Sequence, residues 1–314
     1  MQKRALGKSG IEIVPLVFGG NVFGWTIDEA TSFKILDQLV GEGLNCIDTA
    51  DIYSTWTGQP GISETIIGKW LKTSGKRNQV VIATKLGKEM APGKIGLSKK
   101  YMMTAVEDSL KRLQVETIDL YQSHDDDKNT PLEETMGAFE QLIKAGKVRA
   151  IGASNYTGDR LRQAIEVAKQ KGFHTYQTLQ PHYNLYDRVD YETHLESVCR
   201  EHGLGVIPYF SLASGFLTGK YRSEADFSKS KRGGGMGRFL NERGFKILKA
   251  LDQVSEQHRA TQAQVALAWL MARPGITAPI ASATTPEQLH DIAGALKLNL
   301  DAASIQLLND ASAI

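Results

Sequence analysis

Two side chains that can take part in acid–base chemistry lie five residues apart, directly after a short uncharged run. Asp48 follows Leu44–Ile47, which we expect to be a buried strand, and Tyr53 lies in a loop of small and polar residues. A buried carboxylate needs a cationic partner. A tyrosine that donates a proton near neutral pH also needs a cation, because its ordinary pKa is ~10. One lysine between them meets both needs. Alternatively, Asp48 caps the next turn and Tyr53 only packs.

Two further strand ends carry groups that complement this pair. Lys85 follows Val80–Thr84, and His124 comes after Ile118–Tyr121, and both runs are nearly free of charge. The carboxyl ends of the strands of a parallel barrel meet on one face, so we expect both side chains to lie near Asp48. A lone strand-end lysine is more often an ion-pair partner, and a lone histidine is often a hydrogen-bonded core residue. The combination of four complementary groups favours a catalytic site.

The elements that must position these groups alternate along the chain. A small β-hairpin is predicted around Lys8–Gly10, and apolar runs then predict eight strands: Leu16–Phe18, Leu44–Asp48, Val80–Thr84, Ile118–Tyr121, Val148–Ile151, Thr175–Gln180, Gly205–Ile207 and Ile276–Ile280. Apolar residues at helical spacing and capping signals predict the helices: Asp28–Val40, Ile62–Leu71, Ser98–Leu113, Pro131–Lys144, Leu161–Ala168, Tyr191–Arg200, Glu242–His258, Gln262–Ala272, Pro286–Leu296 and Asp301–Ala311.

This alternation predicts a parallel sheet with right-handed crossovers. Eight units in 314 residues favour an α/β fold of the closed (β/α)₈ TIM-barrel type, with the N-terminal hairpin and extra C-terminal helices as additions. No G-x-G-x-x-G motif follows the first strand, which disfavours a Rossmann fold. No shift in composition marks a linker, so residues 1–314 are expected to form a single domain.

Composition and charge exclude several classes of protein. The chain is 41% hydrophobic and 23% charged, with a net charge of +2, which argues against nucleic acid or a membrane as the main partner. No run approaches the ~18 apolar residues of a membrane span, and the N-terminus lacks the apolar core of a signal peptide. Cys46 and Cys199 form no CxxC pair and are expected to be reduced, which favours a cytoplasmic location. No metal site is predicted.

Motifs along nearly the whole chain resemble the aldo-keto reductase family. The segments that carry the resemblance are Arg4–Gly10, Asp48–Ala50 with Tyr53, Thr84-Lys85, Gly146–Asn155, Leu217–Tyr221 and Val265–Trp269. The family's catalytic tetrad falls on Asp48, Tyr53, Lys85 and His124. The resemblance implies reversible, NAD(P)H-dependent reduction of an aldehyde or ketone. In this scheme Tyr53 is the general acid, Lys85 lowers its pKa, Asp48 holds Lys85, and His124 donates a hydrogen bond to the carbonyl oxygen.

The same resemblance implies the cofactor contacts. The positions that hold the carboxamide match Ser154, Asn155 and Gln180. The aromatic that stacks on the nicotinamide matches Tyr209. The pyrophosphate loop matches Ser211, Leu212, Gly215, Leu217 and Lys220. Alternatively, Asn155 is a cap and Tyr209 an ordinary aromatic of the barrel rim.

The segment after the last strand leaves the choice of cofactor open. By the same resemblance, Ser282, Thr284 and Gln288 lie where a 2′-phosphate would bind. Thr285 with Gln288 is also a capping box, with Pro286 at the first position of a helix whose N-terminus suits an anion. Many relatives carry Lys or Arg here, but this chain has neither between Ser282 and Ile292. The resemblance to the family predicts NADP(H), and the missing basic residue makes NAD(H) a serious alternative.

The substrate side is predicted from position alone. Asn21, Trp25, Trp56 and Asp125 lie where the family lines its pocket. If the acidic run Asp125–Asp127 faces the mouth, it disfavours anionic substrates and suits polyols, sugars or neutral aldehydes; alternatively, it is a solvated loop. Two other functions stay open: a sugar, polyol or pyridoxal-type alcohol dehydrogenase, and a cofactor-binding protein with slow chemistry that resembles a channel subunit. A small-molecule partner is expected, and the sequence does not fix the oligomeric state.

A long segment, Ser211–Asn241, is predicted to be irregular and is called the lid segment below. It contains the basic, glycine-rich run Lys229–Arg238. Glycine loses much backbone freedom on ordering, so this run is not expected to hold a rigid shape alone. We expect it to be mobile without cofactor and to close over bound cofactor; alternatively, it is a disordered loop without cofactor contact.

Overall fold

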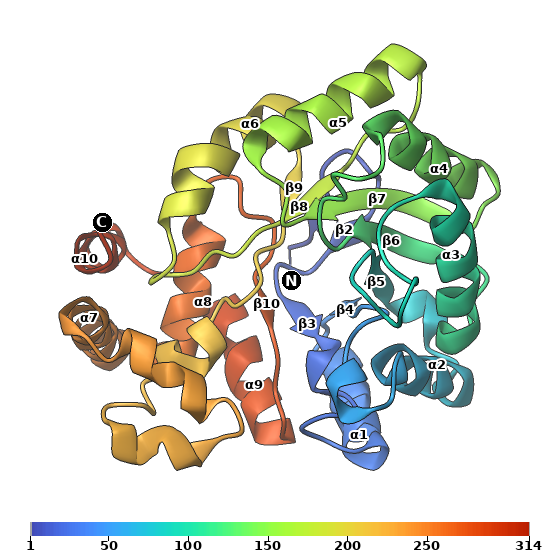
Figure 1. The fold of residues 1–314 in the computed structure, drawn as a ribbon. Coiled ribbons are helices and arrows are strands. Elements are labelled where there is room, and N and C mark those ends of the chain that lie inside the picture. Colours follow the sequence, from blue (N-terminus) through green and yellow to red (C-terminus); the bar gives the residue numbers. More distant parts are fainter. Residues whose placement is uncertain (1, 314) are drawn as a thin grey trace.

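The sheet of the protein is parallel and curls into a TIM-barrel-like ring, as the sequence predicts (Figure 1). The computed structural model describes residues 2–313. Its eight strands follow the order β10-β3-β4-β5-β6-β7-β8-β9. The outermost strands also meet, because Val206 bridges to Ile276 and the Ile280 amide donates to the Pro208 carbonyl at 2.9 Å. The strands are β3 Val17–Gly19, β4 Cys46–Asp48, β5 Val81–Leu86, β6 Ile118–Ser123, β7 Val148–Ser154, β8 Thr178–Gln180, β9 Gly205–Val206 and β10 Ile280–Ala281.

Helices surround this sheet on its outer face (Figure 1). They are α1 Glu29–Gly41, α2 Ile62–Ser74, α3 Lys99–Leu113, α4 Leu132–Lys144, α5 Gly158–Lys171, α6 Glu196–His202, α7 Glu242–His258, α8 Gln262–Ala272, α9 Pro286–Gly294 and α10 Ala302–Ala311. Side-chain caps fix several of their starts: Asp28 accepts from the Thr31 amide, and Ser98 accepts from the Tyr101 amide. The predicted bounds of α7 and α8 agree with the structure, whereas the π-helical turn η4 at Tyr191–Leu195 before α6 was not predicted. No helix within residues 2–313 is both long and apolar enough to cross a membrane.

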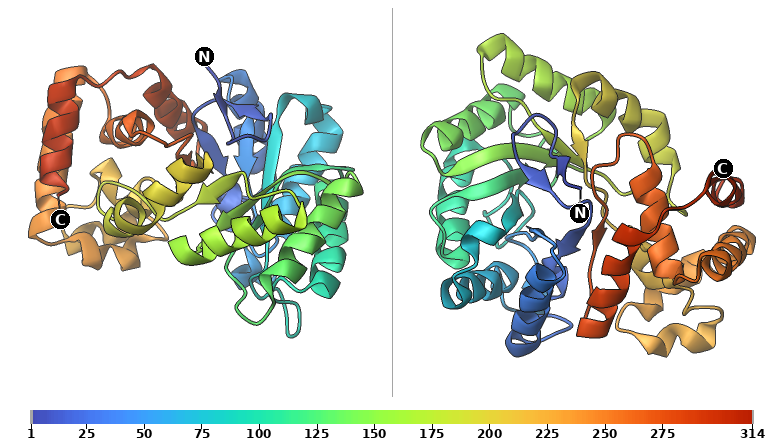
Figure 2. Two further views of the ribbon diagram at one scale, coloured as in Figure 1. Left: turned by 90° about the horizontal axis from the view of Figure 1, so that it is seen from above. Right: turned by 180° about the vertical axis from the view of Figure 1, so that it is seen from behind.

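The N-terminal hairpin closes the amino end of the barrel. Its strands β1 Arg4–Ala5 and β2 Glu12–Ile13 pair antiparallel (Figure 2). Leu6, Ile11 and Ile13 are buried in a cluster with inward-facing side chains of the barrel strands. The other end, where the strands finish, is left for polar side chains.

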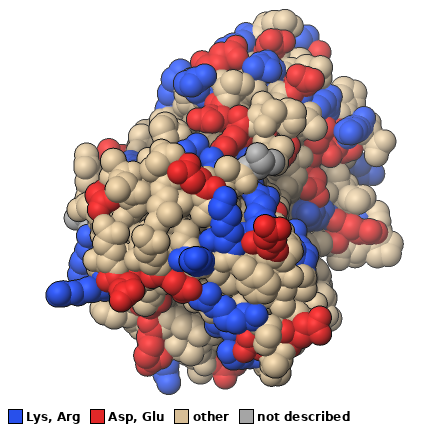
Figure 3. Space-filling view, turned by 90° about the vertical axis from the view of Figure 1, so that its left-hand side faces the viewer, with Lys and Arg blue, Asp and Glu red and all other residues tan. Residues whose placement is uncertain are grey.

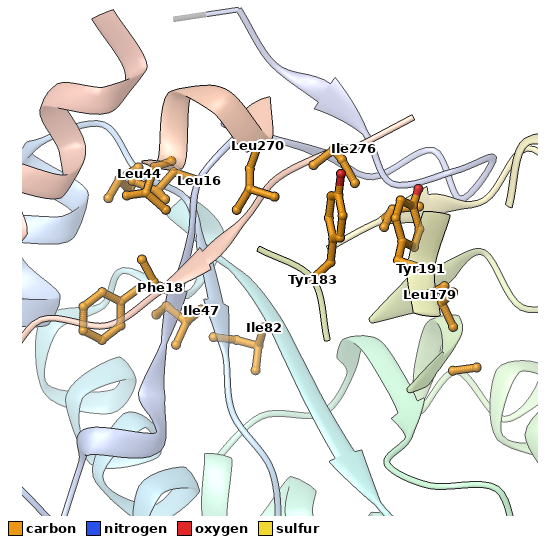
Figure 4. Close-up of a cluster of buried hydrophobic side chains, with 14 of the residues drawn as sticks. Leu16, Phe18, Leu44, Ile47, Ile82, Leu179, Tyr183, Tyr191, Leu270 and Ile276 are labelled. Carbon is orange, nitrogen blue, oxygen red and sulfur yellow. The ribbon is translucent and has the colours of Figure 1, made fainter. Parts of the chain in front are cut away.

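Alternation along the strands decides which residues reach the barrel interior. Phe18, Ile47 and Ile82 face outward on three neighbouring strands and pack against helices (Figure 4). Cys46 and Ala83 take the opposite parity and belong to the interior cluster. Two residues on, that inward series continues into Asp48 and Lys85. The same strand pattern that builds the core therefore directs the candidate catalytic groups inward. Both cysteines are buried and free, as expected.

Prolines shorten some strands relative to the predictions. The last strand was predicted over Ile276–Ile280, but only Ile280–Ala281 form β10. Pro279 has no N–H for the ladder, so Ile276 makes an isolated bridge and regular pairing begins after the proline. The direction of the chain and the position of Ser282 beyond the strand are unchanged.

Close packing of α2 against α3 yields a stability prediction. A Cβ on Gly68 would overlap the backbone of Arg112 and Leu113. We expect Gly68→Ala to lower the free energy of unfolding by about 1–3 kcal/mol, because one helix must move away from the other. Gly41→Ala is the matched control: nothing lies within 4 Å of its added Cβ, and the substitution should be neutral or slightly stabilising. Urea unfolding followed by circular dichroism compares them, and equal midpoints would contradict the described helix packing.

Candidate active site

Asp48, Lys85 and Tyr53 form one hydrogen-bonded group at the carboxyl ends of β4 and β5. The Lys85 Nζ donates to Asp48 Oδ2 at 2.6 Å, to the Tyr53 hydroxyl at 2.9 Å and to the Thr49 carbonyl at 2.8 Å. The ammonium thus donates its three hydrogens to three acceptors. Lys85 is fully buried and Asp48 almost so, whereas Tyr53 is partly exposed. The lysine predicted between the acid and the phenol is therefore present.

Two glutamines complete the surroundings of Asp48. Its Oδ1 accepts from Gln180 Nε2 at 2.8 Å and from Gln122 Nε2 at 3.4 Å. Both glutamines are buried; Gln122 comes from β6 and Gln180 from β8, so they reach Asp48 on β4 through the barrel interior. Gln122 was not predicted as a site residue. Its signal was available in the sequence, because it lies two residues before His124 and so shares that residue's inward parity.

Burial and charge act against each other at the lysine and the phenol. Burial lowers the pKa of Lys85, while Asp48 favours its charged form. Burial, together with the charge of Asp48, raises the pKa of the Tyr53 hydroxyl well above its ordinary value. This differs from the expectation of a lowered tyrosine pKa, because desolvation and the nearby carboxylate outweigh the opposing charge of Arg232. Tyr53 therefore holds its proton at neutral pH.

His124 lies beside Tyr53 as a neutral imidazole. The two rings have centroids 5.9 Å apart in an edge-to-face arrangement. Burial lowers the pKa of His124 well below its ordinary value, and the charges of Lys85 and Lys88 act in the same direction. Its Nδ1 is buried without a hydrogen-bond partner within residues 2–313. A neutral ring with no partner at Nδ1 is able to carry its proton on Nε2, where it serves as a hydrogen-bond donor.

The predicted carboxamide residues lie together but already bond to other protein groups. Asn155 donates to the His124 carbonyl at 2.8 Å and accepts from the Tyr209 hydroxyl at 2.8 Å, with its backbone left-handed at φ 57°. Ser154 donates to the Gln180 carbonyl at 2.9 Å. These bonds still leave one hydrogen of the Asn155 amide and Gln180 Oε1 for a ligand. The ring of Tyr209 stacks on His182, with centroids 5.3 Å apart.

The predicted pyrophosphate residues belong to the turn η5, Ala213–Thr218, and its flanks. Gly215 has a φ of 102°, a conformation that favours glycine. Lys220 lies next to this glycine, because a Cβ added to Gly215 would be 3.5 Å from Lys220 Nζ. Leu217 is fully buried and Leu212 packs against the core, so these two offer backbone groups rather than side chains. The Ser211 hydroxyl donates to the Pro208 carbonyl at 3.1 Å.

At the start of α9, the predicted polar residues are partly engaged with one another. The Ser282 hydroxyl donates to Asn21 Oδ1 at 2.8 Å. The amide and hydroxyl of Thr284 both donate to Gln288 Oε1 at 2.9 Å, which leaves the Gln288 NH₂ group free of that bond. Thr285 caps the helix with Pro286 in its first turn, as predicted, but the reciprocal half of the predicted capping box is missing, because the Gln288 side chain accepts from Thr284.

Trp25 and Trp56, both predicted as substrate residues, make an edge-to-face pair with centroids 5.4 Å apart. Trp56 is 54% exposed, which leaves an aromatic surface available beside Tyr53 in the same loop. Asn21 instead bonds to Ser282 at the end of β10. The two tryptophans therefore come together, whereas the Asn21 side chain is held by the segment after the last strand.

The acidic run beside His124 is not a free negative surface. Asp125 pairs with Lys88 at 3.2 Å, and Asp126 makes two 2.8 Å bonds to Arg160. Asp127 accepts from the Leu97 amide at 2.7 Å. The expectation that these acids would disfavour anionic substrates loses its basis, because each carboxylate is used within the protein.

The lid segment has a defined shape, contrary to the expectation for its glycine-rich run. It forms the 3₁₀ turns η6 Glu224–Lys229 and η7 Gly233–Phe239. Phe239 is buried and stacks on Phe216 with centroids 4.8 Å apart, and Met236 is buried as well. These apolar anchors, which flank or interrupt the glycines, pack the run against the rest of the lid segment.

The chain was compared with known proteins. The model of the aldo/keto reductase family matches residues 15–313. An uncharacterized oxidoreductase, YrpG, from Bacillus subtilis (strain 168) is 37% identical over 318 residues, covering 99% of this chain and 95% of that protein. L-glyceraldehyde 3-phosphate reductase from Escherichia coli (strain K12) is 31% identical, covering 94% and 88%. The aldo-keto reductase yakc [NADP(+)] from Schizosaccharomyces pombe is 30% identical, covering 97% and 90%.

The chain belongs to the aldo-keto reductase family. It is an NAD(P)-dependent oxidoreductase with a TIM-barrel-like fold, which confirms the resemblance seen in its motifs.

Proposed function

We propose that this chain acts as a single domain that reduces an aldehyde or ketone to an alcohol with NADPH, in a reversible reaction for which Tyr53 is the general acid. The observation that carries the proposal is the position of Lys85 Nζ, 2.6 Å from Asp48 Oδ2 and 2.9 Å from the Tyr53 hydroxyl. A purely structural ion pair has no need of a partly exposed phenol as a third member.

The roles follow from the contacts. Reduced nicotinamide, when bound, supplies a hydride to the carbonyl carbon. Tyr53 gives its proton to the carbonyl oxygen, and the charged Lys85 stabilises the phenolate that remains. Asp48 keeps Lys85 charged and oriented. Neutral His124 donates a hydrogen bond to the same carbonyl oxygen and positions it.

The residues present fit a nicotinamide cofactor. A carboxamide requires both a donor and an acceptor, and the site offers the free hydrogen of Asn155 and the Oε1 of Gln180. Tyr209, supported by His182, would provide a flat surface for the ring. Lys220 beside Gly215 would hold the pyrophosphate, with Ser211 and the backbone of Leu212 and Leu217 around it.

NADPH is the proposed reductant, although α9 has no basic residue in its first turn. The free NH₂ of Gln288 and the helix N-terminus supply donors for a 2′-phosphate, and Thr284 would add its own by releasing its bonds to Gln288 Oε1. Ser282 would join them only by giving up its bond to Asn21. One relative carries NADP(+) in its name. NADH lacks this phosphate and would use none of these donors.

The direct test is oxidation of NADPH and NADH, measured separately by loss of the reduced-cofactor absorbance, with a panel of neutral, anionic and cationic aldehydes. We expect consumption that depends on the aldehyde, with a higher kcat/KM for NADPH. Failure of every aldehyde to stimulate either cofactor would contradict the reductase function. A preference for NADH would leave the function in place and overturn the proposed 2′-phosphate contacts.

We further expect cofactor to protect the lid segment from proteolysis. Its anchors lie at Phe216 and Phe239, whereas the exposed stretch between them carries Lys229 and Lys231, which are cleavage sites for trypsin. Lys220 links the start of the segment to the proposed pyrophosphate site. Trypsin cleavage within 223–241 should slow when NADP⁺ saturates the enzyme. Equal cleavage with and without NADP⁺, at a concentration shown to bind, would leave this segment a spacer.

A further inference from the structure

The basic residues of the lid segment fall into two groups. Three have acidic partners: Arg222 pairs with Asp252, Lys229 with Asp226 and Arg238 with Asp187. Lys220, Lys231 and Arg232 have no acidic partner within residues 2–313. Lys220 lies beside Gly215, at the proposed cofactor side. The other two lie elsewhere.

Arg232 lies on the substrate side of the site. Its guanidinium carbon is 5.3 Å from the centroid of the Trp25 ring, and Lys231 next to it donates to the Trp25 carbonyl at 3.1 Å. Trp25 in turn contacts Trp56, which comes from the loop that carries Tyr53. The charge of Arg232 opposes the rise in the pKa of the Tyr53 hydroxyl.

The guanidinium of Arg232 has hydrogen-bonding capacity to spare. No carboxylate or carbonyl within residues 2–313 accepts from it; the hydrogen bonds of Arg232 are made by its backbone, whose amide donates to Ser230 Oγ and whose carbonyl accepts from the Gly235 amide. Packing against an aromatic ring leaves the in-plane N–H groups free for an oxyanion. In the acidic run beside His124, Asp125 is paired with Lys88 and Asp126 with Arg160. On the face drawn in Figure 3, basic and acidic side chains are interspersed.

We propose that Arg232 is a specificity-determining residue that binds an anionic group of the substrate, so that the preferred substrates are aldehydes bearing a carboxylate or phosphate beyond the reacting carbonyl. This inference rests on the proposed reductase function. The ring of Trp25 packs against the guanidinium of Arg232, and two N–H groups of that guanidinium donate to the oxyanion. Asp125 does not repel it, because Lys88 holds that carboxylate.

A matched pair of aldehydes tests this. 4-Carboxybenzaldehyde carries the anion, and methyl 4-formylbenzoate is its neutral ester with a similar shape; because the aldehyde carbonyl of the ester is intrinsically more electrophilic, the acid-to-ester ratio is compared between enzyme variants. We expect the wild-type enzyme to favour the acid in kcat/KM, and Arg232→Met to lower the acid-to-ester ratio about tenfold or more, as for loss of a charged hydrogen bond. Arg238→Met is the control, because that arginine belongs to the same segment but pairs with Asp187. It should keep the wild-type ratio.

Binding separates this inference from the reductase function. Dissociation constants of both aldehydes are measured by tryptophan fluorescence with the NADP⁺-loaded enzyme, in which no reduction occurs. Tighter binding of the acid that Arg232→Met abolishes supports the inference, even if turnover is absent and the reductase function fails. An unchanged ratio in Arg232→Met overturns it. So does weaker NADP⁺ binding with the ratio intact, since the guanidinium would then serve the cofactor.

Discussion

Tyr53→Phe is expected to lower kcat for carbonyl reduction by at least ~10²-fold while cofactor binding stays close to that of the wild type. The phenol is the group that Lys85 Nζ contacts at 2.9 Å, and the substitution removes only the hydroxyl that carries the transferable proton. The ring remains to pack beside His124. Single-turnover kinetics measure the chemical step, and fluorescence titration with NADPH measures binding.

Tyr101→Phe is the matched control for this substitution. It also removes one partly buried hydroxyl, and no hydrogen bond of the Tyr101 hydroxyl occurs within residues 2–313. Its activity should stay near that of the wild type. A Tyr53→Phe enzyme that reduces aldehydes at the wild-type rate, with chemistry shown to limit the turnover, would remove Tyr53 from the role of general acid.

Lys85→Met is expected to suppress activity and to move the pH profile of alcohol oxidation to higher pH. Oxidation needs the phenolate of Tyr53, so its rate rises as pH passes the pKa of that hydroxyl. Burial and Asp48 already raise this pKa, and Lys85 stabilises the phenolate. Without the ammonium the pKa rises further, so the rate increase shifts upward. In the reductive direction the same change keeps Tyr53 protonated to a higher pH and makes it a weaker acid.

Lys69→Met is the control for Lys85→Met. Its ammonium pairs with Glu29 on the surface, where an exposed ion pair contributes little. The pH profile should not move in this variant. Because Asp48 loses its cation when Lys85 is replaced, a fluorescence melting curve must show that the variant is folded. A folded Lys85→Met enzyme with the wild-type pH profile would show that Lys85 is structural and not coupled to Tyr53.

Much of the barrel and of the tetrad could be predicted because both depend on local patterns. Uncharged runs that end in a polar residue place Asp48 and Lys85 at strand ends, and the parallel arrangement brings those ends together. Ser98 and Thr285 were recognisable as caps from their own spacing. Such signals need no knowledge of distant contacts.

The remaining features depend on long-range contacts that no local pattern reports. The spacing of Gln122 from His124 reports its inward direction, but its hydrogen bond to Asp48 follows only once β4 and β6 share the barrel interior. Asp125 resembles a free acid until Lys88 is placed beside it. The glycine-rich run was expected to lack a fixed shape. Its local sequence does not report the stacking of Phe239 on Phe216, because that contact joins residues from separate turns.

The most direct test of the proposed chemistry is the fate of deuterium carried at C4 of the nicotinamide of NADPH. The enzyme is incubated with fully C4-deuterated NADPH and an aldehyde that it consumes, and the alcohol is analysed by NMR. The account predicts one deuterium on the carbinol carbon in the wild type, and far slower formation of this product with Tyr53→Phe. Alcohol without deuterium, or NADPH consumption without alcohol, would contradict direct hydride transfer to the carbonyl carbon at this site.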